Sequence, residues 1–233
     1  MIFSLLVLAA AAAHGENVLT EAEKQAGWIL LFDGRDSSAW KGTASESFPA
    51  GCWTVEDGCL RTRTGPEVKI REDLVSRRTF QDFEMAFEVR LTPGANTGVK
   101  YLVQDHIPFW NGHDYAVGFE MQLIDDSHPD ARSLNRRAGS LYALFAPAKA
   151  AARPIGEWNV GRIVKRGKSV EHWLNGEKVV AYRLDDPSFL DSLKTVRATT
   201  RDMSGWTKWD CPVSLQHHAG DVWFRNLKIR RLE

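Results

Sequence analysis

The sequence predicts an all-β fold in which two antiparallel sheets pack against each other as a sandwich. Strand-like segments recur along almost the whole chain, whereas only one segment has the pattern of a helix. Short turn signals such as Asp57-Gly58 and Asn175-Gly176 separate neighbouring segments. No helical segments alternate with the strands, so crossovers between parallel strands are not expected.

Most of the expected strands are short, and one is long enough to show strict alternation. In residues 83–91, apolar side chains from Phe83 to Leu91 take every second position, and charged residues such as Glu84 and Glu88 lie between them. Such a strand buries one face and leaves the other in solvent. The expected strands are residues 28–32, 53–55, 59–62, 83–91, 98–104, 116–124, 139–144, 159–165, 169–174, 178–182, 213–216 and 222–229.

The one expected helix spans residues 187–193. Asp186 can cap its N-terminus, and Pro187 occupies the first helical position, where a missing N–H costs nothing. The remaining connections include long loops, which in a sandwich gather at the sheet edges and can wall a cleft. These loops are residues 41–52, 104–115, 125–138, 145–157 and 195–212.

Charge and cysteine content exclude several functional classes. The chain has 30 basic and 30 acidic residues, so it lacks the basic excess of a nucleic-acid-binding protein. An Asp57-Gly58 hairpin pairs Glu56 with Cys59 and brings Cys52 near Arg63, so these two cysteines are not opposite each other. With Cys211 they are expected to be small buried thiols, and their spacing indicates neither a disulfide framework nor a zinc site.

The N-terminus resembles a secretory signal peptide. Residues 1–13 form an apolar run that is too short to span a bilayer, followed by small residues typical of a cleavage site. No later segment is apolar for long enough to cross a membrane, and no cysteine follows the run to accept a lipid. We therefore expect a signal peptide over residues 1–15, one domain over residues 16–233, and a secreted or periplasmic protein that does not associate with membranes.

The segment from Gly118 to Asp125, GFEMQLID, carries the main functional signal. Strand alternation places Glu120 and Gln122 on one face and the apolar Met121 and Leu123 on the other. An acid and an amide on a core strand suggest a polar groove on the sheet surface. Aromatic and imidazole side chains surround this strand, as a carbohydrate-binding cleft requires: Trp110, His113, Tyr115, His128 and Tyr142.

A second acid follows in the same segment, so a conventional glycosidase is one open alternative. Laminarinase-like glycosidases have a similar strand of pattern E-x-D-x-x-E, whereas this chain has E-x-Q-x-x-D. Glu120 and Asp125 could act as a retaining pair at about 5–5.5 Å separation. Asp125 reaches the Glu120 face only if a bulge inserts one residue after Gln122. The other alternative is that Asp125 begins a loop.

Loops beside this strand supply further candidates. His106, His113 and His128 are candidate general acids or bases, because an unperturbed imidazole titrates near neutrality. Near the last strands, Gln216 and His218 are expected on one face and His217 on the other. The tryptophans suited either to stacking on a sugar ring or to anchoring loops are Trp110, Trp206 and Trp209.

Several motifs, in order along nearly the whole chain, resemble the 3-keto-disaccharide hydrolase family, formerly a domain of unknown function. The first is Gly27-Trp28 through Phe32-Asp33-Gly34 with Trp40. The others are Asn96-Thr-Gly-Val-Lys100, the segment 118–125 with His128-Pro-Asp130, Arg137-Ala-Gly-Ser-Leu-Tyr142, Gly156-Glu-Trp-Asn159, Val170-Glu-His-Trp-Leu-Asn-Gly176 and Val222-Trp-Phe-Arg-Asn226.

The resemblance implies a concanavalin A-like, laminarinase-like jelly roll and an exported bacterial enzyme. Family members act on glycosides that a separate NAD-type sugar oxidoreductase has oxidised at C3. A C3 ketone acidifies the C2 proton, so a base can remove it and the C1 oxygen can leave. The family usually has Leu-Gln-Asp-His-Gly near the last strand, whereas this chain has Leu215-Gln-His-His-Ala219, so His217 replaces an acid.

The expected site combines these candidates. Its catalytic group is Glu120, His113, His128 and Asp125, and its substrate-binding group is Lys100, Trp110, Gln122, Tyr142, Gln216 and His218. The chain has no dinucleotide-binding fingerprint, and no cofactor is required. A divalent metal held by Glu120 and histidines is an open alternative. A non-catalytic carbohydrate-binding module is the third functional hypothesis.

Overall fold

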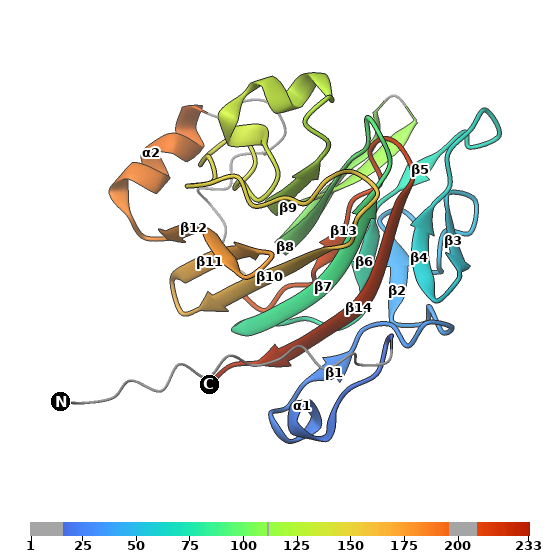
Figure 1. Cartoon of the computed structure of the whole chain (residues 1–233), viewed down its shortest axis with the longest axis horizontal. Coiled ribbons are helices and arrows are strands. Elements are labelled where there is room, and N and C mark those ends of the chain that lie inside the picture. The colour runs from blue at the N-terminus through green and yellow to red at the C-terminus, as the bar shows by residue number, and fades with distance from the viewer. Residues whose placement is uncertain (1–15, 111, 196–208) are drawn as a thin grey trace.

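The computed structural model describes residues 16–110, 112–195 and 209–233, and the described strands form two stacked sheets (Figure 1). The larger, eight-stranded sheet has the order β12-β11-β10-β7-β14-β4-β3, with β1 paired to β14. Its strands are β1 (Ile29–Leu30), β3 (Trp53–Glu56), β4 (Cys59–Thr62), β7 (Phe83–Leu91), β10 (Asn159–Arg166), β11 (Ser169–Leu174), β12 (Glu177–Arg183) and β14 (Val222–Arg231).

The smaller, six-stranded sheet carries the residues of functional interest. Its order is β2-β6-β13-β8-β9-β5, and its strands are antiparallel except for the parallel pair β5 and β9. These strands are β2 (Trp40–Gly42), β5 (Arg71–Glu72), β6 (Leu74–Ser76), β8 (Asn96–Trp110), β9 (His113–Ile124) and β13 (Ser214–Leu215). The two-sheet sandwich predicted from the sequence is confirmed.

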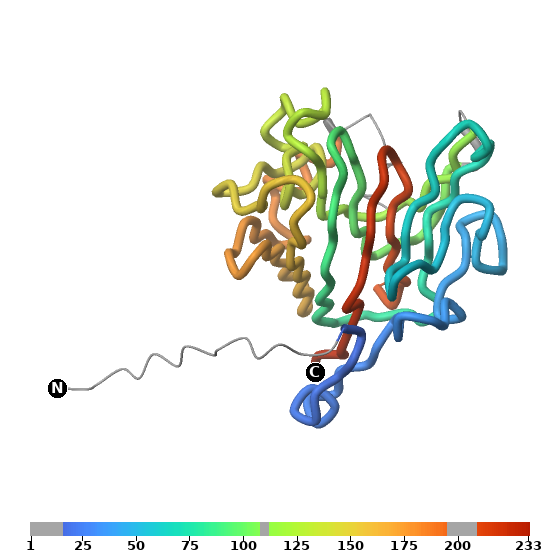
Figure 2. Tube along the Cα trace, turned by 45° about the vertical axis from the view of Figure 1, so that its right-hand side comes forward, coloured from blue at the N-terminus to red at the C-terminus, as the bar shows by residue number. Residues whose placement is uncertain are grey.

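The core lies between the two sheets and follows the predicted alternation. β7 and β14 run side by side through the larger sheet (Figure 2), and Phe83, Met85 and Phe87 of β7 are fully buried. Met121 and Leu123 of β9 are buried in the same apolar cluster. Because alternate residues of a strand point to opposite faces, Glu120 and Gln122 belong to the outer face of the six-stranded sheet.

Four helical segments accompany the sheets in the described parts of the chain: α1 (Glu21–Gln25), η1 (Pro129–Arg132), η2 (Leu134–Arg136) and α2 (Pro187–Thr195). The predicted helix is confirmed as α2, and the Asp186 carboxylate accepts the Ser188 N–H at 2.8 Å, as a cap does. The Asp57-Gly58 hairpin is also confirmed, with Glu56 opposite Cys59. All three cysteines are free and buried.

Two expectations about loops and strands were wrong. Residues 104–115 are mostly strand, because β8 and β9 continue as a long hairpin with register shifts and the start of β9 also pairs with β5. Leu102, with φ of 51°, lies at the first of these shifts. Residues 139–144 form turns rather than a strand, and only Leu141 makes bridges, to Met121 and Phe145. Ala143, with φ of 60°, is incompatible with an extended strand there.

The sequence patterns did not reveal the short strands β2, β5 and β6, because two or three residues are too few to show alternation. The expected signal peptide, residues 1–15, lies outside the described residues. Within residues 16–110, 112–195 and 209–233, no helix has the length and apolar character needed to cross a bilayer.

Candidate active site

Glu120 occupies the middle of β9, on the outer face of the six-stranded sheet. Its side chain is largely buried, with 8% of its surface exposed, while Met121 and Leu123 pack into the core as predicted. The turn segment 139–145 runs along the free edge of β9, where the Glu120 carbonyl accepts the Tyr142 N–H at 3.0 Å. This acid is therefore enclosed by its own sheet and by the segment that follows η2.

Two amides contact the Glu120 carboxyl group. Gln216 Nε2 lies 3.4 Å from Glu120 Oε2. With its amide nitrogen turned towards the surrounding acceptors, Gln122 donates to Glu120 Oε1 at 2.8 Å and to the Thr97 carbonyl at 3.0 Å. Burial raises the pKa of Glu120 to about 7, although the positive charge of Lys100 opposes the rise. A carboxyl group of this pKa can act as a base near neutral pH.

Lys100 is the direct cross-strand neighbour of Glu120, on β8. Its ammonium donates to Asp73 Oδ2 at 2.8 Å and to the Ala116 carbonyl at 3.0 Å. Burial alone would lower the pKa of Lys100, but the carboxylates of Asp73 and Glu120 outweigh it and raise this pKa. The site thus contains a buried, permanently charged ammonium group next to its candidate base.

Asp73 is a buried acid of the site that the sequence patterns did not identify. It lies between β5 and β6 and is fully buried, and it accepts hydrogen bonds from the side chains of Lys100 and His113. Burial opposes the charge of Asp73, but Lys100 and His113 outweigh it and hold its pKa well below the ordinary value. No local pattern marked Asp73, because it follows the charged pair Arg71-Glu72 and precedes only the short apolar pair Leu74-Val75.

Four aromatic and imidazole rings lie beside this charged group. His113 contacts the Tyr115 ring at a centroid distance of 3.5 Å, and His218 lies 6.3 Å from His113 and 6.3 Å from His128. Burial lowers the pKa of His218 to about 4, with His113 and Lys100 adding to the effect, so this imidazole is neutral at pH 7. Burial also lowers the pKa of His113.

His217, the neighbour of His218 in the chain, has other contacts. Its Nε2 donates to the Arg63 carbonyl at 2.8 Å, and its ring packs edge-on against Trp53. Burial lowers the pKa of His217 to about 4, so it is neutral at pH 7. No contact joins its side chain to Glu120 in the described structure, and its backbone N–H instead donates to Asp73 Oδ1 at 2.9 Å.

The structure thus brings most of the predicted site residues together on the outer face of the six-stranded sheet. We call this group, with the newly found Asp73 and the neighbouring Tyr115, the Glu120 cluster. Its members are Glu120, Lys100, Asp73, His113, Tyr115, Gln122, His128, Tyr142, Gln216 and His218.

Asp125 is not part of this cluster. The pairing of β8 with β9 continues without a shift from Lys100–Glu120 to Asn96–Ile124, so no bulge follows Gln122. The two acids are separated by about 16 Å of extended chain, whereas a retaining pair needs about 5–5.5 Å. Asp125 instead accepts the Gly94 N–H at 2.6 Å and bonds to Ser127. Of the two alternatives for Asp125, the retaining pair with Glu120 was wrong and the start of a loop is confirmed, because β9 ends at Ile124 without a bulge.

The remaining candidates lie elsewhere or outside the described atoms. The backbone of Trp110 ends β8, opposite His113, but its side chain lies outside the described residues, as does all of Trp206. Trp209 packs partly buried against the core, with Lys168 Nζ 3.6 Å from its ring centroid, so it anchors a loop. His106 bonds to Asp114 at 2.8 Å.

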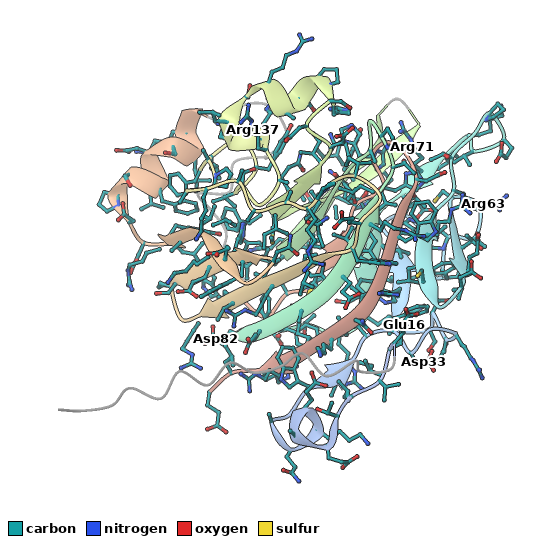
Figure 3. All side chains as sticks on the ribbon, in the orientation of Figure 1. Glu16, Asp33, Arg63, Arg71, Asp82 and Arg137 are labelled. Atoms are coloured by element: carbon teal, nitrogen blue, oxygen red, sulfur yellow. The ribbon has the colours of Figure 1, made fainter. Side chains whose placement is uncertain are left out.

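Two arginines border the Glu120 cluster. Arg71 lies opposite His113 in the β5–β9 pair and donates to the His218 carbonyl at 2.6 Å. Arg136 stacks over the Tyr142 ring at 5.4 Å. Figure 3 places Arg71 at the end of the sandwich away from Glu16 and Asp33. Among the residues that the structure describes, no group of three or more His, Cys, Asp or Glu side chains is arranged to hold a metal ion.

The chemistry available here is proton transfer at a polarised carbon. A buried carboxylate near its pKa can remove a proton, while an adjacent ammonium and amide N–H groups can stabilise the oxygen on which negative charge develops. Neutral imidazoles and phenols at the border can hydrogen-bond to hydroxyl groups. No second carboxylate is positioned for nucleophilic displacement beside Glu120, since Asp73 is fully occupied by hydrogen bonds within the described structure.

Comparison with known proteins gives a consistent result. The chain is 30% identical over 230 residues to a Bacteroides thetaiotaomicron protein named 3-keto-disaccharide hydrolase, covering 89% of this chain and 79% of that protein. A crystal structure of a glycosyl hydrolase candidate from Parabacteroides distasonis has a TM-score of 0.78 and 28% identity, covering 94% of this chain and 100% of its own. Carbohydrate binding module CBM66 from Bacillus subtilis shares the fold alone, with a TM-score of 0.50, 7% identity and coverage of 83% and 96%.

The family comparison covers nearly all of the sandwich. A family model described as 3-keto-alpha-glucoside-1,2-lyase-like domain matches residues 27–230, a span that runs from just before β1 almost to the end of β14. The span includes the whole Glu120 cluster. This chain therefore belongs to the family of 3-keto-alpha-glucoside-1,2-lyase-like domains.

Proposed function

We propose that this protein cleaves glycosides whose sugar carries a ketone at C3, and that Glu120 is the base that removes the C2 proton. The observation that carries the proposal is the buried position of Glu120, which raises its pKa to about 7 beside a permanently charged Lys100. The name of the Bacteroides relative supports the substrate class. A base of this pKa suits an acidified C–H bond at neutral pH.

The proposed reaction is an elimination that water can complete. Glu120 takes the proton from C2, and the electron pair of the C2–H bond forms an enolate with the C3 oxygen. The enolate then collapses: the C3 carbonyl returns, C1=C2 forms and the C1–O bond breaks, and the departing alkoxide takes the proton that Glu120 carries, which restores the Glu120 carboxylate. Addition of water across C1=C2 places a hydroxyl on C1 and a proton on C2, which gives net hydrolysis.

The neighbouring groups fit the donor roles. Lys100 uses two of its three N–H bonds within the described protein, which leaves one for the C3 oxygen. Tyr142 flanks Glu120 and can hydrogen-bond to a sugar hydroxyl, whereas both N–H groups of Gln122 hold the Glu120 carboxylate and the Thr97 carbonyl. Preorganised donors around a developing oxyanion are worth about 3–4 kcal/mol each. These roles require no cofactor.

A paired assay tests this function. The purified protein is given a 3-keto-glucoside and the matched unoxidised glucoside, and product release is followed for both. We expect turnover of the ketone alone, because an unoxidised sugar has no acidified C2 proton. Equal cleavage of both substrates would select a conventional glycosidase, and binding without turnover would select a binding module. The same assay with EDTA and with added Mg²⁺ or Mn²⁺ tests the metal alternative.

The substrate chemistry implies an upstream partner. A separate NAD-type sugar oxidoreductase must supply the C3 ketone, because no dinucleotide-binding fingerprint occurs in this sequence. We also propose that the protein is exported, on the basis of the apolar run in residues 1–13. N-terminal sequencing of the mature protein from a native culture checks this, since export predicts a chain beginning near residue 16.

A further inference from the structure

The carboxylate of Asp73, a member of the Glu120 cluster, has no solvent-exposed surface. Asp73 accepts four hydrogen bonds, from Lys100 Nζ at 2.8 Å, His113 Nε2 at 3.0 Å, the Ala116 N–H at 3.1 Å and the His217 N–H at 2.9 Å. An ionised carboxylate offers about four acceptor positions, so its capacity is used. Asp73 therefore acts on a substrate only through the groups that it holds.

The first of these groups is Lys100. A buried lysine without a carboxylate partner loses its proton or finds another partner. Glu120 is the obvious alternative, because it lies directly opposite Lys100 in the β8–β9 pair. Asp73 competes successfully, since the ammonium bonds to Asp73 Oδ2 and not to Glu120 in the structure. Glu120 therefore keeps a nearby positive charge without a direct ion pair that would weaken it as a base.

The second group is His113. Its Nε2 faces Asp73 Oδ1 and must carry the proton, so its Nδ1 is the unprotonated nitrogen. This Nδ1 is buried and has no partner in the described structure, and the ring lies against Tyr115 and near His218. By holding the proton on His113 Nε2, Asp73 keeps His113 Nδ1 as a hydrogen-bond acceptor among the rings of the cluster.

We propose that Asp73 is the positioning residue of this site: it draws the Lys100 ammonium away from Glu120, so that Glu120 remains a strong base, and it fixes the His113 tautomer. The role rests on the proposed function. The charged and titratable groups facing Glu120 in the described structure are Lys100 from β8, Asp73 from the β5–β6 link and Tyr142 from segment 139–145. Of these, the ammonium is the one whose position Asp73 controls.

The test compares the pH dependence of kcat/KM for wild-type protein, Asp73→Asn and Lys100→Met. The acid limb is the part of the pH profile in which kcat/KM rises as Glu120 ionises. In Asp73→Asn, Lys100 pairs with Glu120 and the negative charge of Asp73 is lost, and both changes lower the pKa of Glu120. The acid limb therefore moves to lower pH by about one unit, and kcat falls about tenfold because Glu120 is a weaker base. In Lys100→Met, loss of the ammonium moves the limb to higher pH. An Asp73→Asn protein that is folded and keeps the wild-type acid limb overturns the proposal.

A control uses a second lysine–aspartate pair, in which the lysine is buried and the aspartate is partly exposed. Lys165 Nζ bonds to Asp82 at 2.7 Å, and Figure 3 shows Asp82 at the far side of the molecule from Arg71. Asp82→Asn thus removes a similar carboxylate without touching the Glu120 cluster, and its acid limb stays at the wild-type pH. A limb that moves equally in Asp82→Asn would assign the shift to general destabilisation and overturn the role of Asp73.

Folding and function are separated by two further measurements. If Asp73→Asn does not fold because the Lys100 ammonium has lost its partner, the double variant Asp73→Asn/Lys100→Met removes that ammonium as well. The acid limb of kcat/KM in this double variant must lie at a lower pH than in Lys100→Met alone. Carbon NMR titration of the Glu120 carboxyl group without substrate reports the same shifts. If no 3-keto-glycoside is cleaved but the NMR shifts occur, the proposed function fails and the Asp73 role stands; absent shifts contradict the Asp73 role whatever the turnover.

Discussion

The carboxyl group of Glu120 occupies the space above Gly98, where a Cβ atom would lie 2.2 Å from Glu120 Oε1. Gly98 is on β8, two residues before Lys100, and is paired with Gln122 of β9. Its backbone angle is ordinary for a strand, so conformational freedom is not the reason for glycine here. The missing side chain instead makes room for the acid, and Gly98 therefore fixes where the candidate base can lie.

Gly98→Ala is expected to lower kcat without unfolding the protein. The three atoms nearest to the added methyl group are Oε1, Cγ and Cδ of Glu120, so the Glu120 side chain must rotate to another rotamer while the backbone can stay in place. We expect kcat to fall by roughly tenfold to a hundredfold, since a displacement of about 1 Å is enough for such a loss. Gly51→Ala is the matched control, because nothing lies within 4 Å of a Cβ at Gly51. Full activity of Gly98→Ala would show that this position of Glu120 is not needed.

Glu120→Gln should lower turnover of a 3-keto-glucoside by roughly 100-fold or more, the usual scale for loss of a general base. Substrate binding changes much less, because Lys100 and Tyr142 remain. The melting temperature should not fall above pH 7, since the substitution removes a buried charge. Asp125→Asn is the comparison, and it should retain turnover while loosening the Gly94 turn. Equal losses in both variants would favour a pair of catalytic acids.

The activity of the wild-type protein should depend on pH through Glu120. Its pKa is raised to about 7, and the base must be ionised to accept a proton. The value of kcat/KM should therefore rise as the pH increases from about 5 to 8, with a midpoint near 7. Initial rates across this range give the midpoint. A midpoint near 4.5, the ordinary value for a glutamate, would mean that the acid is not buried in solution.

The sequence revealed the sandwich wherever a strand was long enough to alternate. Residues 83–91 match β7 because nine residues give several periods of the pattern. The 104–115 connection was mistaken for a loop because the register shifts in β8 interrupt its alternation. Short edge strands such as β5 and β6 gain their stability from neighbouring strands, which no local pattern records.

The candidate site was predicted in part, most clearly where its residues belong to a strand with a visible alternation. Glu120 and Gln122 stood out because two polar residues alternate with buried apolar ones. Asp73 did not stand out in the sequence, because its partners Lys100, His113 and His217 lie at least 27 residues away along the chain. The lack of a bulge before Asp125 is also a tertiary property, since the register is set by pairing with β8.

The buried imidazole of His172 makes the core sensitive to acid. His172 Nδ1 lies 3.2 Å from the Gly139 carbonyl, to which it donates, and its Nε2 accepts from the Tyr101 hydroxyl at 2.8 Å. Burial lowers the pKa of His172 from 6.5 to about 4. Between pH 6.5 and pH 4, His172 is protonated in the unfolded chain but neutral in the folded chain. The free energy of unfolding therefore decreases as the pH falls from 6.5 to 4.

His172→Gln should reduce this acid sensitivity. The amide can keep one of the two hydrogen bonds but cannot be protonated, so the variant loses about 1 kcal/mol at pH 7. Urea unfolding at pH 7 and pH 4.5 gives the difference in the free energy of unfolding. The difference between the two pH values should be smaller in the variant than in the wild-type protein. An unchanged difference would place the acid sensitivity in other groups, such as His217 and His218.

If Glu120 removes the C2 proton, the fate of that hydrogen during turnover reveals it. A 3-keto-glucoside deuterated at C2 is incubated with wild-type protein, with Glu120→Gln and without protein, and deuterium in solvent and products is measured by NMR. We expect the wild-type protein to release the C2 deuterium to water with each turnover, and Glu120→Gln to release it no faster than the sample without protein. Products that retain deuterium at C2 after cleavage by the wild-type protein would contradict this role of Glu120.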